Sequence, residues 1–406
     1  MHFLPILSTL RRHRTAAALI VLEIALTCAI VSNAIFLIRE RLSRMDRDSG
    51  IAEAELVRVQ VAGIGEKSDA MAVTAQDLLT LRTIPGVKFV ANTNMIPFGG
   101  SSWNTDVSTI RDDANRPINA GMFMGSADLV ETLGVKLIAG RDFNADEYVD
   151  FDLVQARKAS IPSVIVTRGV ADKLYPGKSA LGQPLYIWGD EPATIIGVIE
   201  GIARPNEGNG PQFAPYSLVL PITMAFTKGS NYLLRVDPSR RTEVLAAVDA
   251  ALDKTDPGRI VLNRQHYAEI RSNYFRADRA MAYLLAGVSI ALLIITALGV
   301  VGLASFWVQQ RTRQIGIRRA LGATRGDILR YFQTENFILA TLGIILGMGL
   351  AYAINLWMMD KYQVARLPAE FLPIGASLLW LLGQVAVLGP ALRASMIPPA
   401  IATRTV

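Results

Sequence analysis

Few side chains in this sequence have the types and spacing that hydrolytic, nucleophilic or metal chemistry needs. The 406 residues include one cysteine, Cys28, and three scattered histidines, His2, His13 and His266. Zinc sites need several cysteine or histidine ligands at short spacing, and no Ser/His/Asp or Cys/His set is present for nucleophilic catalysis. The sequence therefore predicts a chain that is not itself an enzyme and that holds no metal or cofactor.

One stretch looks like the end of a phosphate-binding loop, Pro176-Gly177-Lys178-Ser179. The full pattern requires another glycine five residues before Gly177, and Asp172 occupies that position. We interpret the stretch as a simple turn. Because no other phosphate loop is present, the sequence predicts that this chain does not bind ATP.

Glu23 lies within an apolar run at residues 15–38. A carboxylate at bilayer depth is costly and usually marks a pathway or a polar contact. Alternatively, Glu23 lies about two turns into the membrane, where water or nearby arginines partly reach it, and both interpretations stay open. The centres of the other three apolar segments contain no Asp, Glu, Lys or Arg, which argues against a secondary transporter.

The composition indicates a chain that is part membrane protein and part aqueous domain. Hydrophobic residues make up 51% and charged residues 19% of the sequence, and the mean hydropathy is +0.31. An apolar helix of about 20 residues spans a bilayer, whereas the apolar core of a signal peptide has only about 7–15 residues. The sequence predicts four transmembrane helices, at 15–38, 280–308, 337–359 and 371–392.

The charges beside these segments orient them. The loop 309–331 carries six arginines and one acid, and residues 1–14 and 393–406 are also basic, while the short loop 360–370 is balanced. By the positive-inside rule the basic stretches are cytoplasmic, so residues 39–279 lie outside the membrane. We reject a nucleic-acid partner as the reason for the net charge of +6, because the arginines cluster beside the membrane segments.

The extracytoplasmic block reads as an α+β domain. Two β-α-β units bracket a long insert at about 94–216, which predicts a split ferredoxin-like core with an inserted β-rich subdomain. The core strands are predicted at 55–62, 87–92, 231–236 and 259–263, and the core helices at 74–82, with Thr74 as N-cap, and at 239–253. The insert is predicted to contain helices at 126–133 and 169–175, strands at 135–138, 163–167 and 194–199, and an exposed loop at 203–215.

Two further helices are predicted at the ends of the second apolar segment. Residues 266–279 are polar but contain no helix breaker, so they should form a stalk continuous with the helix 280–308. Residues 309–313 should prolong that helix into the cytoplasm. The stretch that follows has a short apolar stripe beside two arginines, and a glycine precedes the acid that starts the next helix. The stripe is Ile315, Ile317 and Leu321, the arginines are Arg318 and Arg319, the glycine is Gly322 and the acid is Asp327. A short amphipathic helix of this kind suits docking into a groove on a cytoplasmic protein.

Residues 311–337, RTRQIGIRRALGATRGDILRYFQTENF, resemble the signature of the MacB-like ABC permeases, which share an FtsX-like membrane domain. The resemblance covers nearly the whole chain. Further motifs match in order and spacing: Leu133-Gly134-Val135 with Ala139-Gly140-Arg141-Asp142-Phe143, then Lys173-Leu174-Tyr175-Pro176 with Leu181-Gly182 and Ile196-Gly197-Val198, and finally residues 389–395, GPALRAS, with Pro398-Pro399-Ala400.

The resemblance implies a permease subunit in a bacterial inner membrane, with a large periplasmic domain. The loop would contact separate ABC ATPase subunits, which would bind ATP and Mg²⁺, and a second permease copy would complete a homo- or heterodimer. Force transmitted to the periplasmic domain would drive efflux of a drug, peptide or lipid-linked substrate, and a periplasmic adaptor and an outer-membrane channel are further implied partners. The ATPase-coupling residues would be Arg313, Ile315, Gly316, Ile317, Arg318, Arg319, Ala320, Leu321, Gly322, Ala323, Arg325 and Asp327.

Two departures from the family pattern and two alternatives qualify this expectation. No ATPase domain is fused here, so the ATPase would be a separate chain. The family often has glutamates where this chain has Gln310 and Gln314, which would weaken an ion pair to the ATPase or imply a partner of different charge. Within the same architecture, the alternative is lipoprotein release or control of a cell-wall hydrolase. From another class, the alternative is a membrane-anchored sensor or scaffold without transport.

Overall fold

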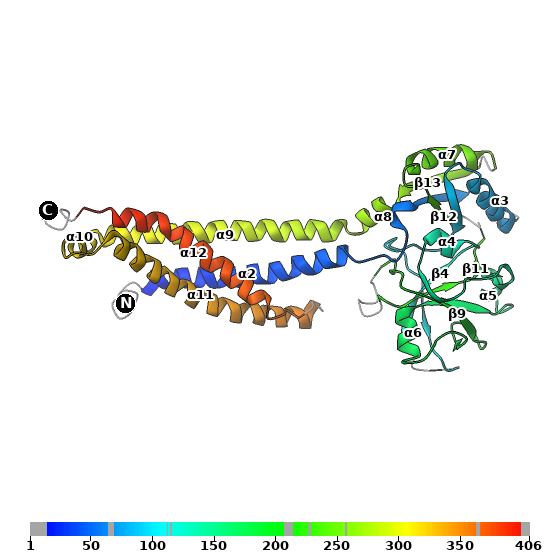
Figure 1. Cartoon of the computed structure of the whole chain (residues 1–406), viewed down its shortest axis with the longest axis horizontal. Helices are drawn as coiled ribbons and strands as arrows, with labels where there is room; N and C mark the ends of the chain where they lie inside the picture. The colour runs from blue at the N-terminus through cyan, green and yellow to red at the C-terminus, as the bar shows by residue number, and fades with distance from the viewer. Residues whose placement is uncertain are drawn as a thin grey trace. The chain divides into compact units, whose positions relative to one another are not determined.

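The computed structural model describes residues 14–63, 69–111, 113, 116–206, 214–225, 229–255, 258–362 and 366–398 (Figure 1). The chain divides into two compact units, Met1–Asp46 with Ala277–Val406, and Arg47–Arg276. Most of the predicted N-terminal segment 1–14 lies outside the described residues, as do parts of the loops 203–215 and 360–370 and of the tail 393–406.

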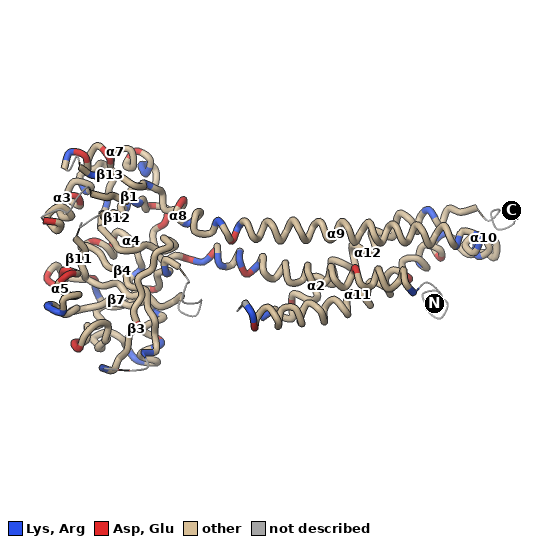
Figure 2. Tube along the Cα trace, turned by 180° about the vertical axis from the view of Figure 1, so that it is seen from behind, with Lys and Arg blue, Asp and Glu red and all other residues tan. Residues whose placement is uncertain are grey.

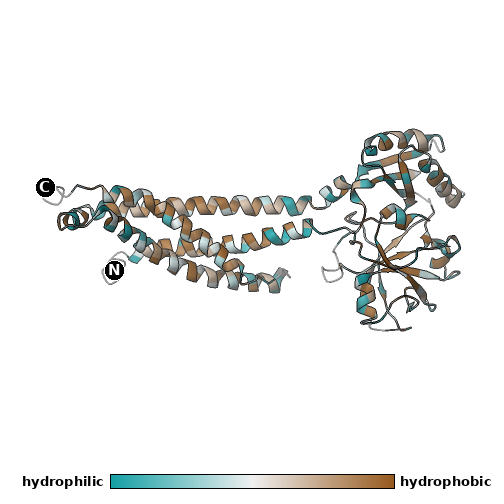
Figure 3. Cartoon of the chain, in the orientation of Figure 1, coloured by the Kyte–Doolittle hydropathy of each residue, from teal (hydrophilic) through white to brown (hydrophobic). Residues whose placement is uncertain are grey.

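The first unit contains four helices that are long and apolar enough to cross a membrane, as the sequence predicted. In Figure 3, most residues of these helices have the colour of hydrophobic residues. They are α2 (Arg14–Met45), α9 (Arg276–Gln310), α11 (Arg325–Tyr362) and α12 (Phe371–Ser395), and a short helix, α10 (Thr312–Ala320), lies between α9 and α11. The helices extend beyond the predicted apolar segments because their polar flanks keep the helical backbone.

Glycines allow the later helices to pack closely on α2. A Cβ atom added to Gly347 of α11 would lie 2.5 Å from the Cβ of Cys28, and one added to Gly375 of α12 would lie 2.3 Å from the Oγ of Ser32. In membranes, where lipid tails are as apolar as the side chains, such small residues let helix backbones approach. Asn33 adds a polar contact, since its Nδ2 donates to the carbonyl oxygen of Ala351 at 3.0 Å.

Asp278, in the first turns of α9, pairs with two arginines near the C-terminal end of α2. The Oδ1 atom of Asp278 lies 2.5 Å from Nη1 of Arg41 and 3.5 Å from Nη1 of Arg44. The Asp278 side chain is only 12% exposed, so this carboxylate is more strongly held than a surface ion pair would be. The contact fixes one end of α9 to α2.

In the second unit, a four-stranded antiparallel sheet confirms the predicted ferredoxin-like core. The sheet has the order β13-β1-β12-β2, which is the arrangement of two interleaved β-α-β units. Its strands are β1 (Leu56–Gly63), β2 (Val87–Asn92), β12 (Gly229–Val236) and β13 (Arg259–His266), and its helices are α3 (Ala70–Arg82) and α7 (Arg241–Asp253). Residues of both helices share one hydrophobic core with the sheet, among them Leu81, Val248 and Val59.

The predicted N-cap of α3 is wrong. Asp69 caps this helix, because its side chain accepts a hydrogen bond from the backbone N–H of Ala72 at 2.9 Å. Thr74 lies one turn further on, where its hydroxyl donates to the carbonyl oxygen of Ala70. Both Asp and Thr are favoured at N-cap positions, and in α3 Asp69 directly precedes the first helical residue.

The insert forms a second, mixed sheet with its own core. Among the described residues the sheet runs in the order β3-β4-β10-β7-β9-β5, with β8 paired to β9. The strands are β3 (Asn104–Val107), β4 (Ile118–Met124), β5 (Leu137–Gly140), β7 (Ser163–Thr167), β8 (Pro184–Leu185), β9 (Ala193–Ile199) and β10 (Ser217–Leu220), and β6 (Val149–Asp150) pairs with β11 (Ile222–Thr223). The accompanying helices are α4 (Leu129–Leu133), α5 (Phe151–Gln155) and α6 (Arg168–Leu174).

The predicted continuous stalk helix is wrong. Residue 266 belongs to β13, α8 spans Tyr267–Tyr274, and the helix is interrupted at Phe275 before α9 begins. Phe275 is 2% exposed, and its ring lies 5.1 Å from the ring of Phe98. Packing of this side chain inside the second unit overrides the local helical tendency, which is the usual way tertiary contacts defeat propensity.

A buried charge network connects α3 to the sheet of the ferredoxin-like core. Nη2 of Arg259 lies 2.7 Å from Oδ1 of Asp77, and both side chains are at most 1% exposed. The hydroxyl of Tyr232 donates to the other carboxylate oxygen of Asp77. Burial, with the adjacent Asp77 charge, raises the pKa of Tyr232, so this hydroxyl stays a donor.

Replacing Asp77 with asparagine should destabilise the protein by about 3–5 kcal/mol, because the Arg259 charge would stay buried without its counter-ion. Denaturant unfolding of the full chain measures the change. Asp253→Asn, which removes the same charge from the exposed end of α7, is the control and should change stability by less than about 0.5 kcal/mol. Equal effects of the two substitutions would contradict the role of the buried pair.

A second acidic side chain, Asp142, lies after β5 in the other sheet. Burial, helped by the nearby carboxylates of Glu131 and Asp128 and opposed by a hydrogen bond from the Phe143 backbone N–H, raises the pKa of Asp142 to about 6. The folded state thus holds this proton more tightly than the unfolded chain, whose Asp titrates near 3.9. The stability that this group contributes is complete below about pH 4 and is lost as the pH rises through about 6.

Asp142→Asn should remove this loss, since asparagine cannot ionise. The free energy of unfolding of the variant should exceed that of the wild type by on the order of 1 kcal/mol at pH 7.5, after allowance for solvent screening, and by almost nothing at pH 4. Urea unfolding of the full chain across this range gives both curves. Asp146→Asn, at an exposed acid in the same loop, should give a curve parallel to the wild type. A difference between the Asp142→Asn variant and the wild type that does not vary with pH would refute the assignment.

Candidate functional site

The basic loop 309–331 folds into α10 and the two corners that flank it. The predicted extension of the second helix through 313 is wrong, because α9 ends at Gln310 and Arg311 takes non-helical dihedral angles. At the other corner Gly322 has φ of +100°, a conformation that a side chain would strain. Figure 2 shows basic residues gathered around α10, while the middle parts of the long helices carry few charges.

The start of α11 is capped by a reciprocal pair. The backbone N–H of Thr324 donates to Oδ2 of Asp327 at 2.9 Å, and the backbone N–H of Asp327 donates to Oγ1 of Thr324 at 3.2 Å. The hydrogen bond from the Thr324 hydroxyl, followed by that from its backbone, lowers the pKa of Asp327. A carboxylate here also complements the positive end of the helix dipole.

The predicted apolar stripe is divided between the interior and the surface. Ile315 is 4% exposed and packs with Ile328, Phe332 and other apolar side chains of α9, α11 and α12. Ile317 is 43% exposed and Leu321 is 83% exposed. One member of the stripe therefore anchors α10, and the other two present apolar surface at the tip.

The two central arginines hold α10 in place. The guanidinium of Arg318 lies 4.8 Å from the ring centroid of Tyr331 on α11. Nη1 of Arg319 donates to the carbonyl oxygens of Ser395 and Ile397 at the end of α12, both at 2.9 Å. These carbonyls are left without helical partners by the helix end, so Arg319 satisfies them and joins α10 to α12.

The remaining predicted coupling residues lie around this frame. Gly316 is buried and Ala323 is half-buried, while Ala320 and Gly322 are exposed. Arg313 and Arg325 are exposed and make no hydrogen bond or ion pair with the part of the chain that the structure describes. The coupling role of these residues stays a prediction.

The sequence analysis did not identify a buried ion pair at the first corner. Nη1 of Arg311 lies 3.1 and 2.9 Å from the two carboxylate oxygens of Glu335, and the Arg311 cation lies 5.4 Å from the ring centroid of Trp307. Arg311 is 7% and Glu335 is 1% exposed. The sequence did contain a signal of this buried pair. Glu335 and Asn336 directly precede the apolar segment that begins at 337, and α11 already begins at Arg325.

Glu23 is half-buried and lies against α9. A Cβ atom added to Gly299 would come within 2.6 Å of the Oε2 atom of Glu23. One turn along, the hydroxyls of Thr27 and Thr296 are 2.8 Å apart. The structure thus places a polar seam between α2 and α9, while the function of Glu23 stays a prediction.

The Arg311–Glu335 pair gives a double-mutant test. Glu335→Gln or Arg311→Met alone should destabilise the first unit by about 3–5 kcal/mol, since each removes one charge of a buried ion pair. Arg311→Met/Glu335→Met should recover most of this loss. Unfolding of the purified chain in mixed micelles, followed by circular dichroism, provides the values, and Arg330→Met, at an exposed arginine of α11, is the control. Simple addition of the two single losses would show that the residues do not interact.

Comparisons with known proteins agree with this architecture. The family model for the MacB-like periplasmic core domain matches residues 17–253, and the model for the FtsX-like permease C-terminal domain matches residues 286–399. Two solved structures are similar at low level. The extracellular domain of the noncanonic ABC-type transporter YknZ from Gram-positive bacteria covers 51% of this chain and 100% of its own, with a TM-score of 0.30 and 15% identity. The periplasmic region of MacB from Actinobacillus actinomycetemcomitans covers 57% and 97%, with a TM-score of 0.32 and 11% identity.

Several curated relatives are export proteins. The macrolide export ATP-binding/permease protein MacB of Chromobacterium violaceum is 29% identical over 243 residues, 59% of this chain and 36% of the relative. The MacB protein of Bdellovibrio bacteriovorus is 26% identical over 374 residues, which are 85% of this chain and 52% of the relative. The pyoverdine export ATP-binding/permease protein PvdT of Pseudomonas entomophila is 28% identical over 226 residues, which are 53% of this chain and 34% of the relative. The chain spans about a third to a half of the length of these relatives. The family model for the MacB-like periplasmic core domain matches more than half of this chain, and this inner-membrane chain therefore belongs to the MacB-like family of ABC transporter permeases.

Proposed function

We propose that this chain is the permease subunit of an ABC exporter that receives force from separate cytoplasmic ATPase subunits at the tip of α10. That force is passed to the periplasmic domain, where it drives efflux of a periplasmic drug, peptide or lipid-linked substrate. ATP and Mg²⁺ bind to the ATPase partner, and a second permease copy completes the complex. A periplasmic adaptor and an outer-membrane channel are its further partners.

The observation that carries this proposal is the exposed apolar tip of a firmly held helix. Leu321 is 83% and Ile317 is 43% exposed, and the exposed cations Arg313 and Arg325 each follow or precede one of them by four residues in the sequence. Exposed apolar side chains with charged side chains nearby are typical of a surface that binds a protein partner. A short amphipathic helix of this kind binds in a groove on its partner.

The anchoring of α10 supports a mechanical role. Arg311 fixes its start to α11, Arg318 rests on Tyr331, and Arg319 holds the end of α12. Because α10 is bound to both α11 and α12, a push on its tip moves these helices together and does not simply bend the loop. α9 is one unbroken helix from this corner to Arg276, so a displacement at its cytoplasmic end is carried along its length.

The relatives favour export over the alternatives within this architecture. Their names give macrolide or pyoverdine export as the activity, and none of the three relatives compared above is named for lipoprotein release or for a cell-wall hydrolase. We therefore assign this chain to efflux.

Leu321→Asp should remove the partner contact without disturbing the fold, since this side chain is mostly in solvent. Affinity purification of the tagged chain from native membranes should recover a co-purifying ATPase, and the variant should reduce the recovered ATP hydrolysis at least about tenfold, as expected for the loss of a central apolar anchor. Leu79→Asp, at a leucine of α3 that is 58% exposed, is the matched control and should leave recovery unchanged. If no ATPase is recovered with the wild type, or if Leu321→Asp recovers as much as the control, the coupling assignment fails.

A further inference from the structure

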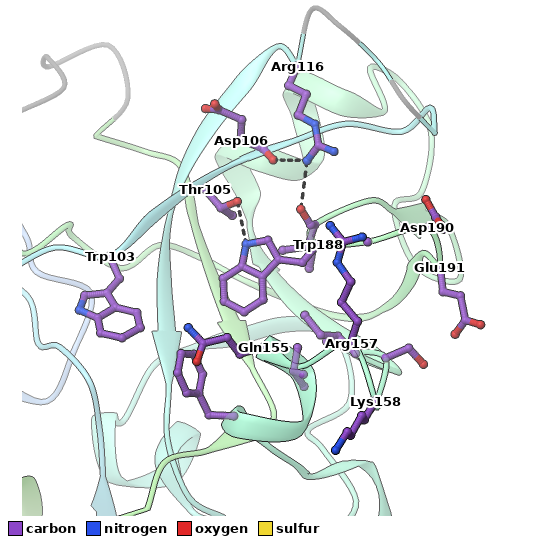
Figure 4. Close-up of a pocket in the computed structure, with 17 residues that line it drawn as sticks. Trp103, Thr105, Asp106, Arg116, Gln155, Arg157, Lys158, Trp188, Asp190 and Glu191 are labelled. Carbon is purple, nitrogen blue, oxygen red and sulfur yellow. Dashed lines mark hydrogen bonds between the residues drawn. The ribbon is translucent and has the colours of Figure 1, made fainter. Parts of the chain in front are cut away.

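A broad groove lies in the insert of the periplasmic domain (Figure 4). It is formed by β3, by α5 with the residues that follow it, and by residues 187–191, and its volume is about 1090 Å³. Small-molecule sites commonly have volumes of about 300–1,000 Å³, so the groove can hold a drug-sized ligand. Nothing in the proposed coupling at α10 uses it.

Aromatic side chains give the groove an apolar wall. Trp103 is 37% exposed, and its ring lies edge-on to Phe151 with centroids 5.7 Å apart. Trp188 is half-buried, and its Nε1–H donates to Oγ1 of Thr105 at 3.2 Å. This hydrogen bond fixes the plane of the indole, so the wall is in place before a ligand arrives. Rigid aromatic surfaces offer stacking to flat ligands at little entropic cost.

Several charged side chains of the groove are used within the protein. Nη1 of Arg116 donates to the carbonyl oxygens of Asp106 and Ile187, at 2.8 and 3.0 Å, and so joins two walls. The Asp106 carboxylate accepts a hydrogen bond from Asn119 at 2.8 Å. Nη2 of Arg111 lies 3.3 Å from Oδ1 of Asp190. These groups build the groove and leave little charge for a ligand.

Two cations lack such partners. The side chains of Arg157 and Lys158 are exposed and make no hydrogen bond or ion pair with the described residues. Arg157 has φ of +55°, a backbone strain that a non-glycine residue usually shows where function or packing requires it. Figure 4 shows the Arg157 side chain extending along the groove, whereas the carboxylate of Glu191 points away from the indoles.

We propose that this groove binds an anionic molecule with a flat aromatic body. The ring system lies against Trp103 and Trp188, and a carboxylate, sulfonate or phosphate group binds Arg157 through charge-assisted hydrogen bonds, while Lys158 adds positive charge at the rim of the groove. A cation of the same shape gains no such contact and is repelled by the two side chains, so it binds more weakly. The inference goes beyond the proposed function, because binding here requires neither the ATPase nor the tip of α10.

The test uses the full chain in nanodiscs of zwitterionic lipid and two naphthalene probes of the same shape. One is 2-naphthalenesulfonate and the other is (2-naphthylmethyl)trimethylammonium. Ligand-observed NMR titration, with empty nanodiscs subtracted, gives each Kd. The sulfonate should bind at least about tenfold more tightly than the ammonium compound, since it gains the charge-assisted contact with Arg157 and the attraction of Lys158.

Two sets of variants locate the binding. Arg157→Gln/Lys158→Gln should weaken sulfonate binding about tenfold or more, and Trp188→Leu should weaken both probes. The matched control, Lys173→Gln/Lys178→Gln, removes two exposed lysines of the same unit outside the groove and should change Kd by less than about twofold. Thermal unfolding shows that each variant is folded. Equal binding of both probes, binding no greater than to empty nanodiscs, or an unchanged Kd in the Arg157/Lys158 variant would overturn the proposal. None of these results bears on ATPase recovery.

Discussion

The pairing of Arg311 with Glu335 is the interaction on which the arrangement of the cytoplasmic corner depends. Both charges are almost fully enclosed by apolar helices, where an unpaired charge is very costly. The chain can therefore leave α9 only where Arg311 reaches Glu335, and this requirement sets where α10 begins. With that start fixed, Ile315 faces the bundle and Leu321 falls at the outer end of the turn. The exposed tip is thus a consequence of a contact made inside the bundle.

Enclosed or partly enclosed ion pairs join helices to neighbouring elements in the part of the chain that the structure describes, and three of them were described above. Asp278 joins α9 to α2, Glu335 joins the α9–α10 corner to α11, and Asp77 joins α3 to β13. In a bundle surrounded by lipid, apolar contacts between helices are only slightly better than contacts with lipid tails. A buried charge is costly without its counter-ion, so each ion pair fixes which residues of two helices contact each other. Apolar surfaces alone do not provide this specificity. In the aqueous unit, hydrophobic burial provides most of the stability and the pair adds orientation.

Sequence periodicity predicted the elements whose burial follows a simple pattern. The strand 87–92, the strand 163–167 and the antiparallel core followed from alternation and from the repeated β-α-β order. Contacts between distant residues decided the rest. Phe275 interrupts a helix because Phe98 lies against it, and Glu335 was missed because its partner is 24 residues earlier in the chain. The groove was not predictable from local sequence, since its walls come from Trp103, Arg157 and Trp188, which only the fold of the insert brings together.

The glycine contacts on α2 have a consequence for the biogenesis of the protein. α2 is the first of the four spans to leave the ribosome, and its partners Gly299, Gly347 and Gly375 all follow the second unit in the sequence. Synthesis of the intervening residues Arg47–Arg276 takes roughly 10–50 s at ordinary translation rates. During that interval α2 stands alone in lipid with Glu23, Thr27 and Asn33 unsatisfied by later helices. Until the remaining spans arrive, these polar side chains lack their partners on α9 and α11, where polar groups in lipid are costly. The contacts that hold the finished bundle together therefore make its first assembly intermediate less favourable.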